Sequence, residues 1–88
     1  MCRNIKPLFN FDPPATDEEI RNAATQFVRK LSGFQQPSHA NEVAFNLGVD
    51  EVAESARHLL GALVTDAHPR DREIEAAKAH ARAVKRFG

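Results

Sequence analysis

The 88-residue sequence contains one cysteine, Cys2, and has neither tryptophan nor tyrosine. One cysteine cannot form an intrachain disulfide, which excludes the small disulfide-stapled proteins of oxidising compartments. No stretch approaches the roughly 18 apolar residues of a membrane-spanning helix, and the first residues lack the apolar segment of a secretory signal. We therefore expect a cytoplasmic protein with no membrane partner.

The sequence also lacks an excess of charge, because 12 Lys plus Arg balance 12 Asp plus Glu. Net charge therefore gives no reason to expect nucleic acid as a partner. Residues 38–68 are nevertheless acidic and residues 69–88 basic. The simplest interpretation is that the second and third predicted helices attract each other side by side. The alternative is a basic strip that binds nucleic acid. That strip would consist of Lys78, Arg82, Lys85 and Arg86.

The length suits a single domain, residues 1–88, with a modest core. Residues 1–15 contain Pro7 and the Pro13-Pro14 pair. Proline fixes the backbone and removes an amide donor, so this segment is predicted to be an extended N-terminal arm. The remainder, residues 16–88, is predicted to form a helical bundle.

A capping box marks the first helix. Thr16 and Glu19 have the spacing at which each side chain accepts a hydrogen bond from the other residue's backbone amide. Apolar residues then recur every three or four positions until Ser32 and Gly33, which provide a stop signal. This pattern predicts a helix over about residues 17–31.

The same periodicity predicts two further helices. Ser38 can cap a helix over about residues 39–65. This helix is apolar on two sides. A bend or break in it would be expected at Gly48, because glycine is a poor helix former. After a turn, residues 70–86 place a narrow apolar seam on an alanine-rich helix. The predicted fold is all-α, a three-helix bundle preceded by the extended arm.

Five motifs are distributed along the chain. They are Met1-Cys2-Arg3-Asn4-Ile5-Lys6, Leu8-Phe9-Asn10-Phe11, Pro13-Pro14-Ala15-Thr16, Phe27-Val28-Arg29-Lys30-Leu31-Ser32-Gly33 and Pro69-Arg70-Asp71-Arg72-Glu73. As a set they resemble a family of short bacterial proteins catalogued only as a domain of unknown function. The resemblance spans the whole chain and implies a small cytoplasmic bacterial protein. It implies no activity, cofactor or catalytic residue.

Cys2 has the most reactive side chain. Removal of Met1 would leave a cysteine with both a thiol and a free α-amine, and Arg3 and Lys6 would favour the thiolate. Such a chain end would suit soft-metal binding, thiol sensing or a small transferase. The sequence has no Gly-rich oxyanion loop to support catalysis. The alternative is that Cys2 is a small buried side chain that pins the arm to the bundle.

A second, weak candidate metal site lies on the second helix. Asp50, Glu54 and His58 are spaced by four residues, so their side chains share one helix face. A solvated acidic surface explains the same pattern. The sequence contains no phosphate loop, dinucleotide fingerprint, paired-cysteine zinc site or nucleophile elbow. We therefore expect no cofactor, and the sequence favours a non-enzymatic protein without settling the point.

The leading hypothesis is a small helical interaction module. The second helix carries more apolar surface than so small a bundle covers, which leaves a patch for a protein partner or a homodimer. The residues expected on that patch are Phe9, Phe11, Phe34 and Phe45. The alternatives are a Cys2-dependent protein and, more weakly supported, nucleic-acid binding through the basic strip.

Overall fold

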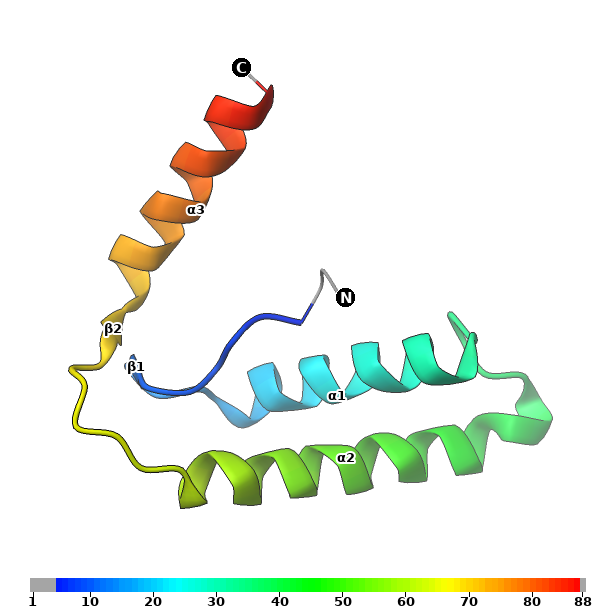
Figure 1. Cartoon of the computed structure of the whole chain (residues 1–88). Coiled ribbons are helices and arrows are strands. Elements are labelled where there is room, and N and C mark those ends of the chain that lie inside the picture. The colour runs from blue at the N-terminus through cyan, green and yellow to red at the C-terminus, as the bar shows by residue number, and fades with distance from the viewer. Residues whose placement is uncertain (1–4, 88) are drawn as a thin grey trace.

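The computed structural model describes residues 5–87, with side chains described up to Lys85. Over these residues it contains three α-helices (Figure 1), which are α1 (Asp17–Ser32), α2 (Glu42–Ala62) and α3 (Arg72–Phe87). A 3-10 turn, η1 (His39–Asn41), leads directly into α2. The predicted all-α class with three helices is confirmed, and the predicted limits differ from the observed ones by only a few residues.

Both ends of α1 follow from its sequence. The Thr16 hydroxyl accepts a hydrogen bond from the Glu19 amide at 3.1 Å, and the Thr16 amide donates to the Glu19 carboxylate at 2.9 Å. Gly33 ends the helix at φ 79°, and its amide donates to the Arg29 carbonyl. Glycine adopts this left-handed conformation without a steric penalty, so it is the residue that ends many helices. The predicted capping box and stop are both confirmed.

Helices α1 and α2 form an antiparallel hairpin (Figure 1). Four buried residues lie between them: Ile20, Ala24, Val49 and Ala53. Two of the four are alanines, which let the helix backbones approach closely but bury little apolar area. Helix α2 continues through Gly48 without a break. The hairpin core is therefore narrow and sensitive to any increase in side-chain volume.

Two very short strands join the arm to the segment before α3. Strand β1 (Phe11–Asp12) pairs in parallel with β2 (Arg70–Asp71), and β2 continues directly into α3. Leu8 of the arm packs against the hairpin core. The extended arm is thus docked over its described residues.

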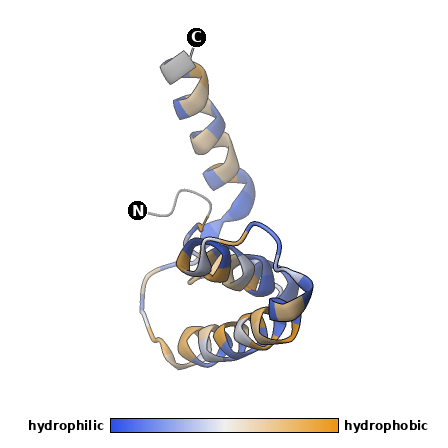
Figure 2. Cartoon of the chain, turned by 90° about the vertical axis from the view of Figure 1, so that its right-hand side faces the viewer, coloured by the Kyte–Doolittle hydropathy of each residue, from blue (hydrophilic) through white to orange (hydrophobic). Residues whose placement is uncertain are grey.

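Helix α3 extends away from the hairpin instead of lying along it (Figures 1 and 2). The radius of gyration is 15.5 Å, whereas a compact domain of this length has one of about 12 Å. This arrangement differs from the expected side-by-side contact of the second and third helices. The physical reason is that α3 is held at its N-terminal end, by β2 and its first residue, and not along its apolar seam.

The narrow core gives a first prediction. Replacing Ala53, which is 2% exposed, with leucine should lower the free energy of unfolding by about 1–3 kcal/mol, because the extra methylenes force the helices apart. Ala44→Leu makes the same change at an exposed position of α2 and should alter stability by no more than about 0.5 kcal/mol. Urea unfolding followed by circular dichroism measures both. Equal effects of the two variants would contradict the close packing of Ala53.

Candidate functional site

The arm makes a sharp turn before β1. Asn10 has φ 63°, a left-handed conformation that asparagine tolerates better than most residues. Its side-chain amide donates to the Ala67 and His68 carbonyls at 3.4 and 3.2 Å, and its carbonyl accepts from the Arg70 amide at 2.8 Å. Asn10 therefore holds the loop before α3 against the arm, which places β2 beside β1.

Arg72, the first residue of α3, connects three segments. Its guanidinium donates to both Glu19 carboxylate oxygens at 2.7 and 2.8 Å, and its Nε donates to the Pro13 carbonyl at 2.7 Å. The guanidinium carbons of Arg72 and Arg70 lie 5.7 and 5.8 Å from the centre of the Phe11 ring, within cation–π range. We call this group, Phe11, Pro13, Glu19, Arg70 and Arg72, the arm junction.

The arm junction changes the acidity of Glu19. Hydrogen bonds from Arg72, then from the Thr16 amide, lower the pKa of Glu19 from 4.5 to about 2, while desolvation acts in the opposite direction. The Arg72 and Glu19 side chains are 31% and 33% exposed. A bidentate arginine–carboxylate pair of this kind fixes orientation as well as charge, so it sets the direction in which α3 leaves the hairpin.

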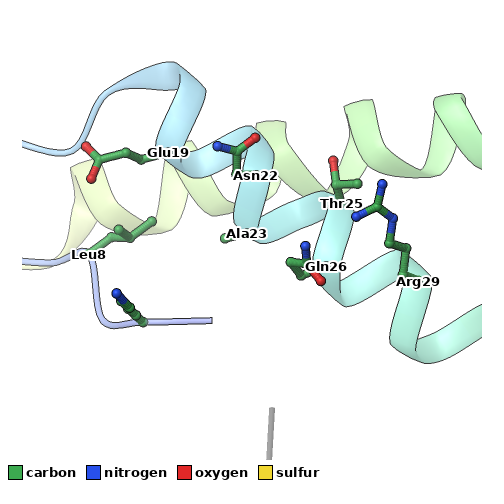
Figure 3. Close-up of a pocket in the computed structure, with 8 residues that line it drawn as sticks. Leu8, Glu19, Asn22, Ala23, Thr25, Gln26 and Arg29 are labelled. Atoms are coloured by element: carbon green, nitrogen blue, oxygen red, sulfur yellow. The ribbon is translucent and has the colours of Figure 1, made fainter. Parts of the chain in front are cut away.

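The arm lies between two surface clefts. One, of about 380 Å³, separates the arm from α1 (Figure 3), where Leu8 approaches from the arm and polar side chains extend from α1. Arg29 lines this cleft, and its Nε is buried with no hydrogen-bond partner in the described part of the chain. The other, which we call the arm cleft, lies between the arm and α3 and has a volume of about 480 Å³. Four basic side chains, Lys6, Arg70, Arg72 and Arg82, line it together with two carboxylates, Glu19 and Glu75, and apolar side chains.

The four phenylalanines expected on one interaction surface lie at opposite ends of the hairpin. Phe11 is in the arm junction, and Phe9 is half-buried beside it. Phe34 is 40% exposed in the connection after α1, and Phe45 packs against the hairpin core near the start of α2. The structure therefore does not bring all four onto one surface.

The carboxylates of the candidate metal site bind arginines. Asp50 accepts from Arg21 at 2.6 Å, and Glu54 accepts from Arg57 at 2.9 Å and lies 3.2 Å from His58. Arg57, and then His58, lower the pKa of Glu54. Within residues 5–87, no group of three His, Cys, Asp or Glu side chains is arranged to hold a metal ion. Cys2, the other candidate, lies outside the described residues.

The basic strip is divided by the structure. Arg82 faces the arm cleft, whereas Lys78 lies 3.8 Å from Glu75 and Lys85 is exposed outside the cleft. The side chain of Arg86 lies outside the described part. Sequence reasoning missed the pairing of Glu19 with Arg72, because the capping box already accounted for Glu19 and nothing local marked Arg72.

The apolar surface is larger than the predicted patch. The seam of α3 is open to solvent, with Ile74 and Val84 55% and 54% exposed. Other large apolar side chains are exposed on or beside the hairpin. These are Phe27, Leu31, Phe34, Val43, Leu47, Leu59, Leu63 and Val64. The two apolar stripes of the second helix were the sequence signal for part of this surface.

These features define a small all-α protein, a helical hairpin with an outlying third helix. Residues 1–78 match the family model of DUF2277, described as an uncharacterized conserved protein, and the chain belongs to that family. The expected kinship with an uncharacterised family is thereby confirmed. Neither a curated protein nor a solved structure matches the chain. None of the helices in residues 5–87 combines the length and apolar character of a transmembrane span.

The Glu19–Arg72 pair gives a second prediction. The pKa of Glu19 is lowered from 4.5 to about 2, so its ionised form stabilises the fold above pH 4.5, and this contribution is lost as the pH falls through about 2. In an NMR titration, the Glu19 carboxyl carbon should show a midpoint near 2. Arg72→Gln should raise the midpoint towards 4.5, while the Thr16 amide keeps part of the shift.

Arg70→Gln is the matched control. Arg70 lies over the Phe11 ring, as Arg72 does, but it does not donate a hydrogen bond to Glu19 in the described structure. It should leave the Glu19 midpoint in place. Circular dichroism over the same pH range establishes that the helices persist at each point. An unchanged midpoint in Arg72→Gln would mean that the capping box alone sets the acidity of Glu19.

Proposed function

We propose that this protein is a non-enzymatic interaction module that self-associates, with α3 of each copy packed on the α1–α2 hairpin of the other. The observation that carries the proposal is the position of α3, which leaves its seam exposed and lies outside the hairpin (Figure 1). A dimer with C2 symmetry covers the exposed seam of both copies at once, because each copy supplies one α3 and one hairpin.

The exposed area supports this arrangement. The chain exposes 7245 Å², whereas a compact monomer of its mass exposes about 5,200 Å². The excess is about 2,000 Å², and a protein–protein interface of standard size needs only about 800 Å² from each partner. The isolated chain therefore has ample surface for a stable dimer.

The seam of α3 has the spacing of a helix-pairing surface. Ile74, Ala77, Ala81 and Val84 are separated by three, four and three residues, the spacing of the apolar positions in paired helices. A helix of 16 residues is only marginally stable alone in water and is about 24 Å long, enough to lie along most of a hairpin helix. Packing against a second copy would stabilise it.

The charges of the two surfaces are complementary. Helix α3 contains five basic and two acidic residues, a net charge of +3, and the hairpin, residues 17–62, contains four basic and seven acidic residues, a net charge of −3. Opposite charge favours their association and its orientation. The hairpin also offers the apolar side chains that such a contact needs, including Phe27, Val43 and Leu47.

The proposal gives a third prediction. Val84→Lys places a charge in the seam and should weaken dimerisation at least tenfold, because burying an unpaired ammonium in an apolar contact is costly. Ala83→Lys is the matched control, since it adds the same charge one residue away, on the side of α3 about 140° from the seam centre. Sedimentation velocity over a concentration series, in reducing buffer, measures both variants and the parent chain.

Small-angle scattering supplies the second readout. The proposal is supported if the parent chain and Ala83→Lys dimerise with the same affinity and Val84→Lys dimerises more weakly. Cys2→Ser should also dimerise as the parent chain does, which excludes a disulfide-linked pair. A compact monomer with a radius of gyration near 12 Å would overturn it, because α3 would then fold onto its own hairpin. Equal loss of dimer in both lysine variants would also overturn it.

A further inference from the structure

The arm cleft is lined by basic side chains and by four apolar ones, Leu8, Phe11, Ala76 and Ala79, which we call the apolar floor. Leu8 and Phe11 of the arm face Ala76 and Ala79 of α3 across it. Lys6, Arg70 and Arg82 are basic residues of the same cleft, and each comes from a different segment of the chain. The volume of about 480 Å³ falls in the range of small-molecule sites, roughly 300–1,000 Å³.

The charges of the arm cleft are not balanced within the described chain. Four basic residues and two acidic residues line it, and one pair, Glu19 with Arg72, neutralises itself. The remaining acid, Glu75, lies 3.8 Å from Lys78, a lysine outside the cleft. Among the side chains of residues 5–85, none of Lys6, Arg70 and Arg82 forms an ion pair with a carboxylate.

Arg70 is held in place by contacts of both its side chain and its backbone. Its guanidinium lies over the Phe11 ring, which Arg72 also approaches, and its backbone is fixed by the pairing of β2 with β1. Arg72 is neutralised by Glu19, whereas Arg70 has no carboxylate partner among the described side chains, so a bound anion would supply the missing negative charge. A cleft with basic residues on several sides also concentrates anions from solution.

We propose that the arm cleft binds a small organic phosphate, a phosphate monoester with an apolar or aromatic body. The phosphate dianion matches the excess of positive charge, and arginine side chains present the paired donors that phosphate oxygens accept. The apolar body lies on the floor formed by Leu8, Phe11, Ala76 and Ala79. A polyanion would need a continuous basic track, but neither Lys78 nor Lys85 lines the cleft.

This proposal is independent of self-association. Ala76 and Ala79 project from the side of α3 that lies about 150° from the seam of Ile74, Ala77, Ala81 and Val84. A second copy packed on the seam therefore leaves the arm cleft open. Val84→Lys should bind the phosphate ligand as the parent chain does, which separates failure of one proposal from failure of the other.

Phenyl phosphate is the probe for the fourth prediction. Titrated into the isotope-labelled full chain at pH 8, it should shift the amide NMR signals of Arg70, Ala76 and Ala79 and leave those at the η1 end of the hairpin unchanged. Phenol lacks the dianion and inorganic phosphate lacks the apolar body, so each should bind at least tenfold more weakly. Affinity for inorganic phosphate equal to that for phenyl phosphate would overturn the role of the apolar floor.

Single-charge variants locate the site. Arg82→Gln and Lys6→Gln should each weaken phenyl phosphate binding about tenfold, since each removes a charge-assisted hydrogen bond. Lys85→Gln removes the same charge one turn along α3, outside the cleft, and should change affinity less than twofold. Both α3 positions are exposed, so helix content by circular dichroism should be unchanged. Equal weakening by Arg82→Gln and Lys85→Gln, or shifts spread over the whole chain, would overturn the proposal.

Discussion

The Glu19 carboxylate holds the structure together at the point where its segments meet. Through Thr16 it closes the first turn of α1, and through Arg72 it fixes the start of α3, which is 53 residues distant in the sequence. Arg72 in turn holds the Pro13 carbonyl, so the arm is trapped between the two helices. The strand pairing and both walls of the arm cleft depend on this arrangement. Hydrogen bonds to the carboxylate favour its ionised form, which explains the low pKa of Glu19.

Polar contacts determine how the arm and α3 are positioned because the apolar core is so small. Within the part of the chain that the structure describes, only Ile20, Ala24, Val49 and Ala53 are buried, and all four belong to the hairpin. None of the described side chains of α3 belongs to that core, so the position of α3 rests on hydrogen bonds at its first residues. Such contacts define a direction but bury little area, which is why the seam of α3 and part of the hairpin stay exposed.

The sequence predicted the local features and missed the long-range ones. The capping box and the Gly33 stop act over three or four residues, so spacing alone reveals them. Ser38 was a reasonable cap, but the chain first forms η1, and α2 begins only at Glu42. The pairing of Arg72 with Glu19 has no periodic signal, since it depends on a turn at Asn10 that brings β1 beside β2. For the same reason, the pattern did not separate Phe9 and Phe11 from Phe34 and Phe45.

The two proposed activities use opposite faces of one helix that is attached only at its base. A phosphate ligand in the arm cleft would contact the arm through Lys6 and α3 through Arg82, so it would restrict the angle between α3 and the hairpin. The seam lies on the opposite side of α3, so a second copy packed there leaves these ligand contacts in place. Ligand binding and dimerisation are therefore separate equilibria, and the loss of one leaves the other. The arm junction sets the angle between α3 and the hairpin in the free chain.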